Sequence, residues 1–178
     1  MINFNLYIPT ELRNVQLLSE LEMTINIEDL LESRDSYSLF FSSSHFLCDQ
    51  ITHIPGSILR IEGYGLQWHG YIYLLNDILP EIIGCLKSVE KGDSFSIMFC
   101  EFNSLRILNF INDSDKIYES HCKDMLTDET IGNKESIESE VLYNYFIEII
   151  KVFSSFVKRL YPNIFHDYVK PYLDENIV

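Results

Sequence analysis

The sequence predicts a single α+β domain in which a mainly antiparallel sheet packs against two or three amphipathic helices. Residues 57–121 predict a strand, a helix and then three strands, joined by short turns. Residues 138–161 carry apolar side chains at steps of three and four, which is the period of an amphipathic helix. The length of 178 residues allows one good core and does not require a second domain. We therefore treat residues 1–178 as one domain organised around the central unit 57–121.

The segment before the central unit contains one clear strand and several weaker patterns. Apolar and polar side chains alternate over residues 1–8 until Pro9, which predicts a strand. Residues 10–21 have a weakly helical pattern, and Asn26 is a candidate N-cap for a short helix that follows. The stretch 36–42 (SYSLFFS) predicts a further strand.

The central unit starts with a strand at residues 57–64, and its helix allows two interpretations. An apolar stripe with the helix period covers residues 68–89, but Pro80 lies inside it and removes one backbone donor. In one interpretation a long helix is kinked at Pro80. In the other, a strand precedes a helix that starts at Asn76 or Asp77, so that the proline lies in the tolerated first turn. The stripe keeps its phase across the proline, which favours the kinked helix.

The rest of the chain predicts strands, a loop and two helices. Residues 94–111 have the pattern of a hairpin, and residues 116–121 form the third strand. Residues 122–139 are polar and show no periodicity, which is typical of a loop. The C-terminal helices cover residues 138–173, and Pro162 ends the first of them.

The charge balance is the strongest signal in the composition. The chain has 13 Lys and Arg residues against 27 Asp and Glu residues, a formal net charge of -14. A field of this sign repels nucleic acid and anionic membranes and speeds the encounter with basic partners. The simpler explanation is that the acidic surface serves solubility alone.

The sequence shows no pattern of a secreted or membrane protein. No positively charged segment followed by an apolar core precedes Pro9, so no signal peptide is expected. No apolar run reaches the ~18 residues that a spanning helix needs. Residence in the cytoplasm is therefore the expectation.

The cysteines and histidines show no spacing typical of a metal or nucleophilic site. They are Cys48, Cys85, Cys100 and Cys122, and His45, His53, His69, His121 and His166. His45 and Cys48 have a two-residue gap, but zinc sites usually combine two such pairs, and His121 directly precedes Cys122. We expect reduced, buried thiols and no metal or cofactor. Nucleotide binding is not expected either, because Gly63 and Gly65 lack the third glycine of a dinucleotide fingerprint.

An acidic tract follows the hairpin and is the candidate interaction surface. Residues 112–140 contain nine acidic residues and only three lysines. We expect six of them to contact a partner, because loops on a rigid sheet often carry recognition residues. These six are Asp113, Asp115, Glu119, Asp124, Asp128 and Glu129. An acidic surface loop without a partner is the alternative.

The first three of these acids resemble the start of a calcium-binding loop. Asp113, Asp115 and Glu119 lack the glycine of the sharp turn, and no glutamate stands at the twelfth position. A solvated hairpin tip is the better interpretation.

The order of elements resembles that of a known group of small proteins. Between residues 68 and 160 it reads helix, Lys91-Gly92, strand SFSIMF (94–99), strand LRIL (105–108), turn, strand, polar loop and amphipathic helix. This layout is similar to that of bacterial immunity proteins, which neutralise polymorphic toxins, including those of contact-dependent growth inhibition systems. The resemblance implies a non-catalytic, acidic protein that binds one cognate toxin domain, often a basic nuclease. No residue-level motif is carried over.

Three classes of function therefore remain open. The first is a cytoplasmic immunity protein that binds a basic toxin domain through its acidic surface, either as a monomer or as a homodimer. The second is a small enzyme that uses a cysteine or histidine between the sheet and a helix. The third is an adaptor subunit whose long helix docks into a larger complex.

Overall fold

The computed structural model describes residues 2–12, 15–31, 33–65, 72–101, 104–114 and 116–177. Its strands are β1 (Asn3–Tyr7), β2 (Ile58–Glu62), β3 (Phe95–Glu101), β4 (Ser104–Ser114), β5 (Ile117–Asp124) and β6 (Thr130–Glu138). Its longer helices are α1 (Glu20–Leu30), α2 (Ser36–Thr52), α3 (Leu75–Lys91) and α4 (Ser139–Leu160). The shorter helical segments are η1 (Ile72–Leu74), α5 (Pro162–Ile164), η2 (Phe165–Val169) and α6 (Lys170–Asn176).

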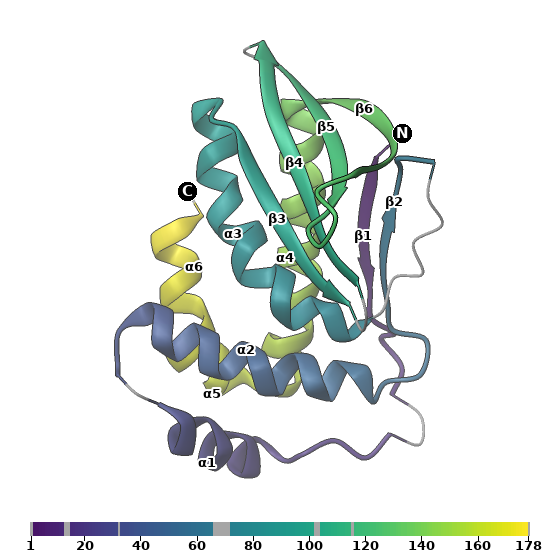
Figure 1. Cartoon of the computed structure of the whole chain (residues 1–178). Coiled ribbons are helices and arrows are strands. Elements are labelled where there is room, and N and C mark those ends of the chain that lie inside the picture. Colours follow the sequence, from purple (N-terminus) through teal and green to yellow (C-terminus); the bar gives the residue numbers. More distant parts are fainter. Residues whose placement is uncertain are drawn as a thin grey trace.

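Two antiparallel sheets form the β part of the fold. One contains β1 and β2, and the other has the strand order β3-β4-β5-β6. Helices α3 and α4 pack against these sheets, while α1 and α2 lie across the lower end of the molecule in Figure 1. The α+β fold class is confirmed, with α3 and α4 against the sheets and further helices packed on these two. None of the helices in the described ranges has the length and apolarity needed to cross a membrane.

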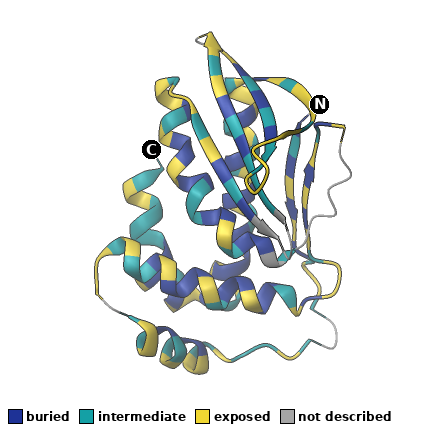
Figure 2. Ribbon diagram, viewed as in Figure 1, coloured by how far each residue is buried: buried dark blue, intermediate teal, exposed yellow. Residues whose placement is uncertain are grey.

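The four-stranded sheet has one buried and one open face. Along β5, Tyr118, Ser120 and Cys122 are fully buried, whereas Glu119 and His121 on the other face are partly exposed. This alternation follows from the period of two in a strand. Figure 2 shows the same change from buried to exposed residues along the strands and around α3. The core therefore lies between the sheets and the helices.

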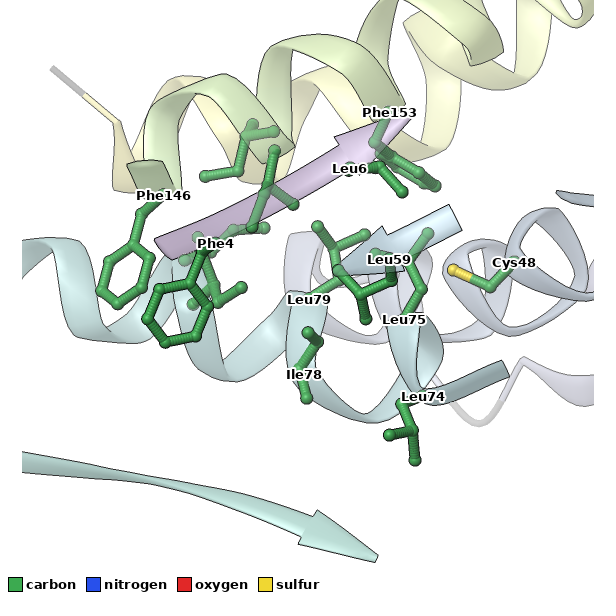
Figure 3. Close-up of a cluster of buried hydrophobic side chains, with 14 of the residues drawn as sticks. Phe4, Leu6, Cys48, Leu59, Leu74, Leu75, Ile78, Leu79, Phe146 and Phe153 are labelled. Atoms are coloured by element: carbon green, nitrogen blue, oxygen red, sulfur yellow. The ribbon is translucent and has the colours of Figure 1, made fainter. Parts of the chain in front are cut away.

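Phe146 of α4 joins the two sheets within the core. Its ring lies 5.6 Å from that of Phe4 in β1, at 75°, and 6.2 Å from that of Phe95 in β3. Edge-to-face arrangements of this kind are favourable for aromatic rings. Figure 3 shows Phe4 and Phe146 side by side, together with Leu6 and Phe153 along the same helix and strand. The wide apolar face that the sequence predicts for α4 is thus buried against β1 and β3.

Helix α3 covers the outer edge of β3. The backbone N–H of Met98 points away from β4 and donates to Glu81 Oε2 of α3 at 2.8 Å. The thiol of Cys85 lies 4.0 Å from the carbonyl oxygen of Ser96 on the same edge. Burial raises the pKa of this thiol to about 12, so it remains protonated.

Tyr64 fastens the end of β2 to the larger sheet. Its side chain is fully buried, and its hydroxyl lies 2.6 Å from the hydroxyl of Ser120 in β5. Its backbone oxygen accepts a hydrogen bond from Asn133 N of β6 at 2.7 Å. The φ angle of 58° is unusual for a tyrosine, so the surrounding contacts must hold this conformation.

We expect Tyr64→Phe to lower the free energy of unfolding by about 1–3 kcal/mol. The substitution leaves the buried hydroxyl of Ser120 without this partner, and an unsatisfied buried polar group carries a desolvation cost of this size. Urea denaturation of the two proteins measures the difference. The double variant Tyr64→Phe/Ser120→Ala serves as the control, because removing both polar partners should restore part of the loss. A double variant that loses the full sum of both single effects would contradict this interpretation.

The strand predicted at residues 36–42 is wrong, because this stretch begins α2. The side chain of Asp35 caps the helix by accepting a hydrogen bond from Ser38 N at 2.9 Å. Hydrogen bonds from Ser33 and from Ser38 lower the pKa of Asp35 to about 2. The cap and the helix-period burial of Phe40, Leu47 and Ile51 outweigh the β propensity of SYSLFFS.

The helix predicted at residues 10–21 is also wrong. Helix α1 begins at Glu20, where Ser19 and Glu22 form a capping box. Asn26 consequently lies inside α1 and is not its N-cap. The helix therefore starts where Ser19 caps it, and the leucine spacing of the preceding residues does not extend it.

The loop predicted at residues 122–139 is wrong over most of its length. Strand β5 continues to Asp124, and β6 follows at Thr130. In the pairing of β5 with β6, Tyr118 lies opposite the buried Ile137. Most other side chains of β6 are exposed. An edge strand that buries so little of its surface has no apolar alternation, which is why the sequence reads as a loop.

The structure places Pro80 between the two interpretations of its helix. Helix α3 starts at Leu75, one residue before the alternative start, and Pro80 lies in its second turn. Residues 66–71, which include the beginning of the longer predicted helix, lie outside the described ranges. Gly92 ends α3 in the left-handed conformation, at φ 71°, which glycine adopts without strain.

The predicted helix that ends at Pro162 is confirmed as α4. The last predicted helix, up to residue 173, is divided into α5, the π-helical segment η2 and α6. Pro171 occupies the start of α6, where a missing backbone donor is tolerated.

Candidate functional site

The six acids selected from the sequence do not form one surface. Asp113 lies near the end of β4, and Asp115 is outside the described residues. Asp124, Asp128 and Glu129 lie at the opposite end of the sheet, where β5 turns into β6. The strand β5 between the two groups is ~23 Å long at ~3.3 Å per residue. A single small contact therefore cannot include both groups.

The carboxylates at the β5–β6 turn have local partners. Asp124 Oδ1 accepts hydrogen bonds from Leu126 N at 2.8 Å and from Thr127 N at 3.2 Å. Asp128, at φ 58°, forms an ion pair with Lys123 at 3.0 Å. Aspartate is common in such turns because its short side chain bonds to the following backbone. These acids shape the turn, and their presence does not require a binding partner.

Glu119 is paired as well, in the middle of the open sheet face. Its Oε1 accepts from Lys134 Nζ of β6 at 2.6 Å. The hydrogen bond and the charge of Lys134 lower the pKa of Glu119. This cross-strand pair explains Glu119 as part of the sheet.

Asp113 belongs to a different cluster, which the structure assembles from three elements. The end of α3, the β4–β5 hairpin and the beginning of α4 meet at the upper end of the molecule in Figure 1. Five exposed carboxylates gather there, and we call them the acidic end. They are Glu90, Asp93, Asp113, Glu138 and Glu140. Within the described ranges none of the five forms an ion pair, although the exposed Lys91 and Lys116 lie on the same elements.

Hydrogen bonds hold the three elements of the acidic end together. Tyr118 donates its hydroxyl to the carbonyl oxygen of Asp93 at 3.1 Å, which ties β5 to the end of α3. The backbone N–H of Ser139 donates to the carbonyl oxygen of Lys116 at 2.8 Å, which ties α4 to the hairpin. The carboxylates are thus presented by a preorganised backbone, which reduces the entropy lost on binding.

A hollow of about 280 Å³ lies within the acidic end. It is lined by Val89, Glu90, Ser139, Glu140 and Tyr143. Tyr143 donates its hydroxyl to Glu90 Oε1 at 3.1 Å. Partial burial and this contact with Glu90 raise the pKa of the tyrosine. A tyrosine beside two carboxylates combines an apolar ring with a polar tip, a combination that is enriched at protein interfaces.

Two of these acids lie at the C-terminal end of α3, where the helix dipole disfavours negative charge. Glu90 lies in the last turn of α3, and Asp93 directly follows its C-cap Gly92. The C-terminal end of a helix carries partial negative charge and favours cations, so each acid there costs about 0.3–1 kcal/mol. Glu138 and Glu140, at the beginning of α4, are by contrast favoured by the helix dipole. The stability of α3 therefore does not explain Glu90 and Asp93.

We expect Asp93→Asn to raise the free energy of unfolding by about 0.3–1 kcal/mol. The substitution removes an exposed negative charge from the negative end of α3 and leaves the backbone contact with Tyr118 in place. Urea denaturation at low ionic strength provides the measurement. Glu140→Gln is the matched control, because it removes a favourable charge at the beginning of α4 and should have the opposite sign. A loss of stability in Asp93→Asn would show that this carboxylate has a structural role.

Sequence reasoning selected Asp113, counted Glu138 and Glu140 in the acidic tract without selecting them as contacts, and missed Glu90 and Asp93. Glu138 and Glu140 belong to the acidic tract of the sequence, whereas Glu90 and Asp93 lie far from it. The sequence signal for Glu90 and Asp93 was the presence of acids on both sides of Gly92, which ends the helix, because lysine or arginine is usual at that end.

The histidines and cysteines within the described ranges are spread over several helices and strands. His45 is exposed on α2, and the Cys48 thiol, three residues later, is buried. Burial raises the pKa of the Cys48 thiol well above its usual range, which disfavours the reactive thiolate. Among the residues that the structure describes, no group of three His, Cys, Asp or Glu side chains is arranged to hold a metal ion.

The acidic end has to be interpreted from its own geometry. Comparison of the chain with protein-family models, with curated proteins and with solved structures finds no match. The arrangement offers exposed carboxylates, a partly buried tyrosine and a fixed backbone, all of which suit recognition of a cationic protein surface.

Proposed function

We propose that this chain is a cytoplasmic, non-catalytic immunity protein that binds and neutralises a basic toxin domain through the acidic end. The observation that carries the proposal is the gathering of five exposed carboxylates where the end of α3, the β4–β5 hairpin and the beginning of α4 meet, with Glu90 accepting a hydrogen bond from Tyr143. A net charge of -14 adds a long-range field of the same sign. Association of oppositely charged proteins is accelerated by such a field.

The partner class follows from charge and from chemistry. Nucleases and other proteins that act on nucleic acid need a cationic surface to hold phosphates. A rigid set of carboxylates matches that surface and competes with the substrate for the same Lys and Arg side chains. Neutralisation then requires no reaction by this chain, because occupying the cationic surface blocks the substrate.

The acidic end provides both steering and anchoring groups. Asp93, Asp113 and Glu138 are exposed without a recorded ion pair and are available to attract a partner. Tyr143 and the exposed side chain of Ile117, which pairs with Glu138 across the sheet, supply apolar area at the same place. Buried aromatic contacts of this kind slow dissociation more than surface charges do.

The experiment uses the protein encoded immediately upstream of this chain. Its C-terminal domain is produced in cells with and without this chain, and growth is measured. We expect growth arrest with the domain alone and recovery when both are present, together with a stoichiometric complex on size-exclusion chromatography. A domain that carries net negative charge, or arrest that persists in the presence of this chain, would contradict the proposal.

A further inference from the structure

A second surface lies at the other end of the molecule, between α1 and α2. A groove of about 450 Å³ is lined by Leu30, Tyr37, Ser38, Phe41, Ser42 and His45. Leu30 belongs to α1 and the other residues to α2, and Figure 1 shows the two helices lying one above the other. The groove therefore runs along α2, and the end of α1 contributes Leu30 to it.

Large apolar side chains line this groove and remain in contact with solvent. Tyr37 is 53% exposed, Phe41 48% and Leu30 51%. The rings of Tyr37 and Phe41 stack at 6.0 Å with an angle of 22° between their planes. Tyr37 also meets the ring of Tyr172 of α6 edge-on at 5.9 Å, which fixes its orientation. Grouped and oriented apolar side chains on a surface mark an interaction site more often than isolated ones do.

The charge around the groove is almost entirely negative. Residues 20–52, which include both helices, contain seven carboxylates and a single arginine. The carboxylates are Glu20, Glu22, Glu28, Asp29, Glu32, Asp35 and Asp49. The arginine, Arg34, is already paired with Glu28. An occupant that matches this groove needs an apolar face and cationic flanks.

We infer that the groove binds an amphipathic helix with a basic polar face, supplied by another protein. Tyr37, Phe41 and His45 are spaced four residues apart along α2, so the apolar strip rises ~12 Å and matches two turns of a docked helix. Asp29, which adjoins Leu30, and Asp49, one turn beyond His45 on α2, are exposed and placed to meet the lysines or arginines that flank the apolar side of such a helix. The occupant inserts apolar side chains between Leu30 and Phe41.

This surface is separate from the acidic end and goes beyond the proposed function. Asn76, near the beginning of α3, contacts His45 of α2 at 3.3 Å, whereas Glu90 in its last turn belongs to the acidic end. The fourteen steps from Asn76 to Glu90 rise ~21 Å at ~1.5 Å per residue. One chain can therefore hold a partner at each end.

The test uses a synthetic peptide as the probe. The peptide is fluorescently labelled, has about 18 residues, all leucine or lysine, and places its leucines at helix spacing. Its control has the same composition, but leucine and lysine alternate strictly. We expect the full chain to bind the helical peptide at least about tenfold more tightly than the alternating one. Fluorescence anisotropy gives both affinities. Equal affinities would overturn the proposal, because attraction between charges alone would explain the binding.

Variants of the chain locate the binding site. Tyr37→Ser/Phe41→Ser should weaken binding of the helical peptide at least about tenfold, since it removes both apolar anchors. Ile111→Ser is the matched control, because Ile111 is similarly exposed, at 46%, on β4. It should change the affinity by less than about twofold. Equal losses in both variants would overturn the assignment.

Two measurements on the unaltered chain complete the test. Peptide binding should shift the backbone amide signals of Ser38 and Ser42 in NMR spectra more than those of Asp113 at the acidic end. The opposite pattern would overturn the proposal. Sedimentation equilibrium determines whether a second copy of this chain occupies the groove. A dimer that Tyr37→Ser/Phe41→Ser dissociates would replace the proposed partner by self-association.

Discussion

Phe146→Ala is expected to lower the free energy of unfolding by about 3–5 kcal/mol. The ring of Phe146 is fully buried and touches Phe4 of the small sheet and Phe95 of the large one. Its removal costs the transfer free energy of a phenyl group and leaves a cavity between two sheets that cannot close independently. A loss of this size is a large part of the stability of an ordinary domain. Urea denaturation followed by circular dichroism measures the change.

The control for this substitution is Asn144→Ala, two residues earlier on α4. Asn144 is exposed, and the alanine keeps the helix without opening a cavity. We expect its effect to remain within about 0.5 kcal/mol. A loss below about 1 kcal/mol in Phe146→Ala would contradict the packing described for Phe146, because a buried phenyl group rarely costs so little.

Neutralising the acidic end is expected to slow association with the basic partner about tenfold at low ionic strength. The variant combines Asp93→Asn, Asp113→Asn and Glu138→Gln, which removes three exposed carboxylates with no recorded ion pair. Electrostatic steering raises association rates by ~10–10³, and the charges nearest the contact contribute most. Stopped-flow association with the toxin domain, repeated over a range of salt concentrations, should show a lower rate and a weaker salt dependence.

A second triple variant changes the net charge equally at the other end of the sheet. It combines Asp124→Asn, Asp128→Asn and Glu129→Gln at the β5–β6 turn. If the acidic end is the contact, this variant should slow association by less than about threefold, through the overall field alone. A larger effect in this variant than in the first would move the contact to the β5–β6 turn.

The sequence predicted the elements that bury a regular apolar face and missed those that do not. Strand β1 and helix α4 place their apolar residues at periods of two and of three to four, and both were predicted. Strand β6 lies at the edge of the sheet and buries little more than Ile137, so no alternation revealed it. Helix α2 was missed because the aromatic residues of SYSLFFS favoured a strand and the capping side chain of Asp35 was overlooked.

The candidate site was only partly predictable for a similar reason. Asp113 stood out because it belongs to a dense acidic tract. Glu90 and Asp93 join it through the pairing of β3 with β4, which brings the end of α3 beside the hairpin. Contacts between residues so distant in the sequence arise from tertiary packing, and local patterns do not record them.

The contact between Glu81 and the outer edge of β3 limits the ways in which another chain can attach. An added strand would need the N–H group of Met98 as a donor, and the carboxylate of Glu81 already accepts it. The sheet therefore resists extension at β3 by a foreign peptide or by a second molecule, which also protects it from forming fibrils at high concentration. Strand addition to this sheet is consequently left to its other edge, which is β6.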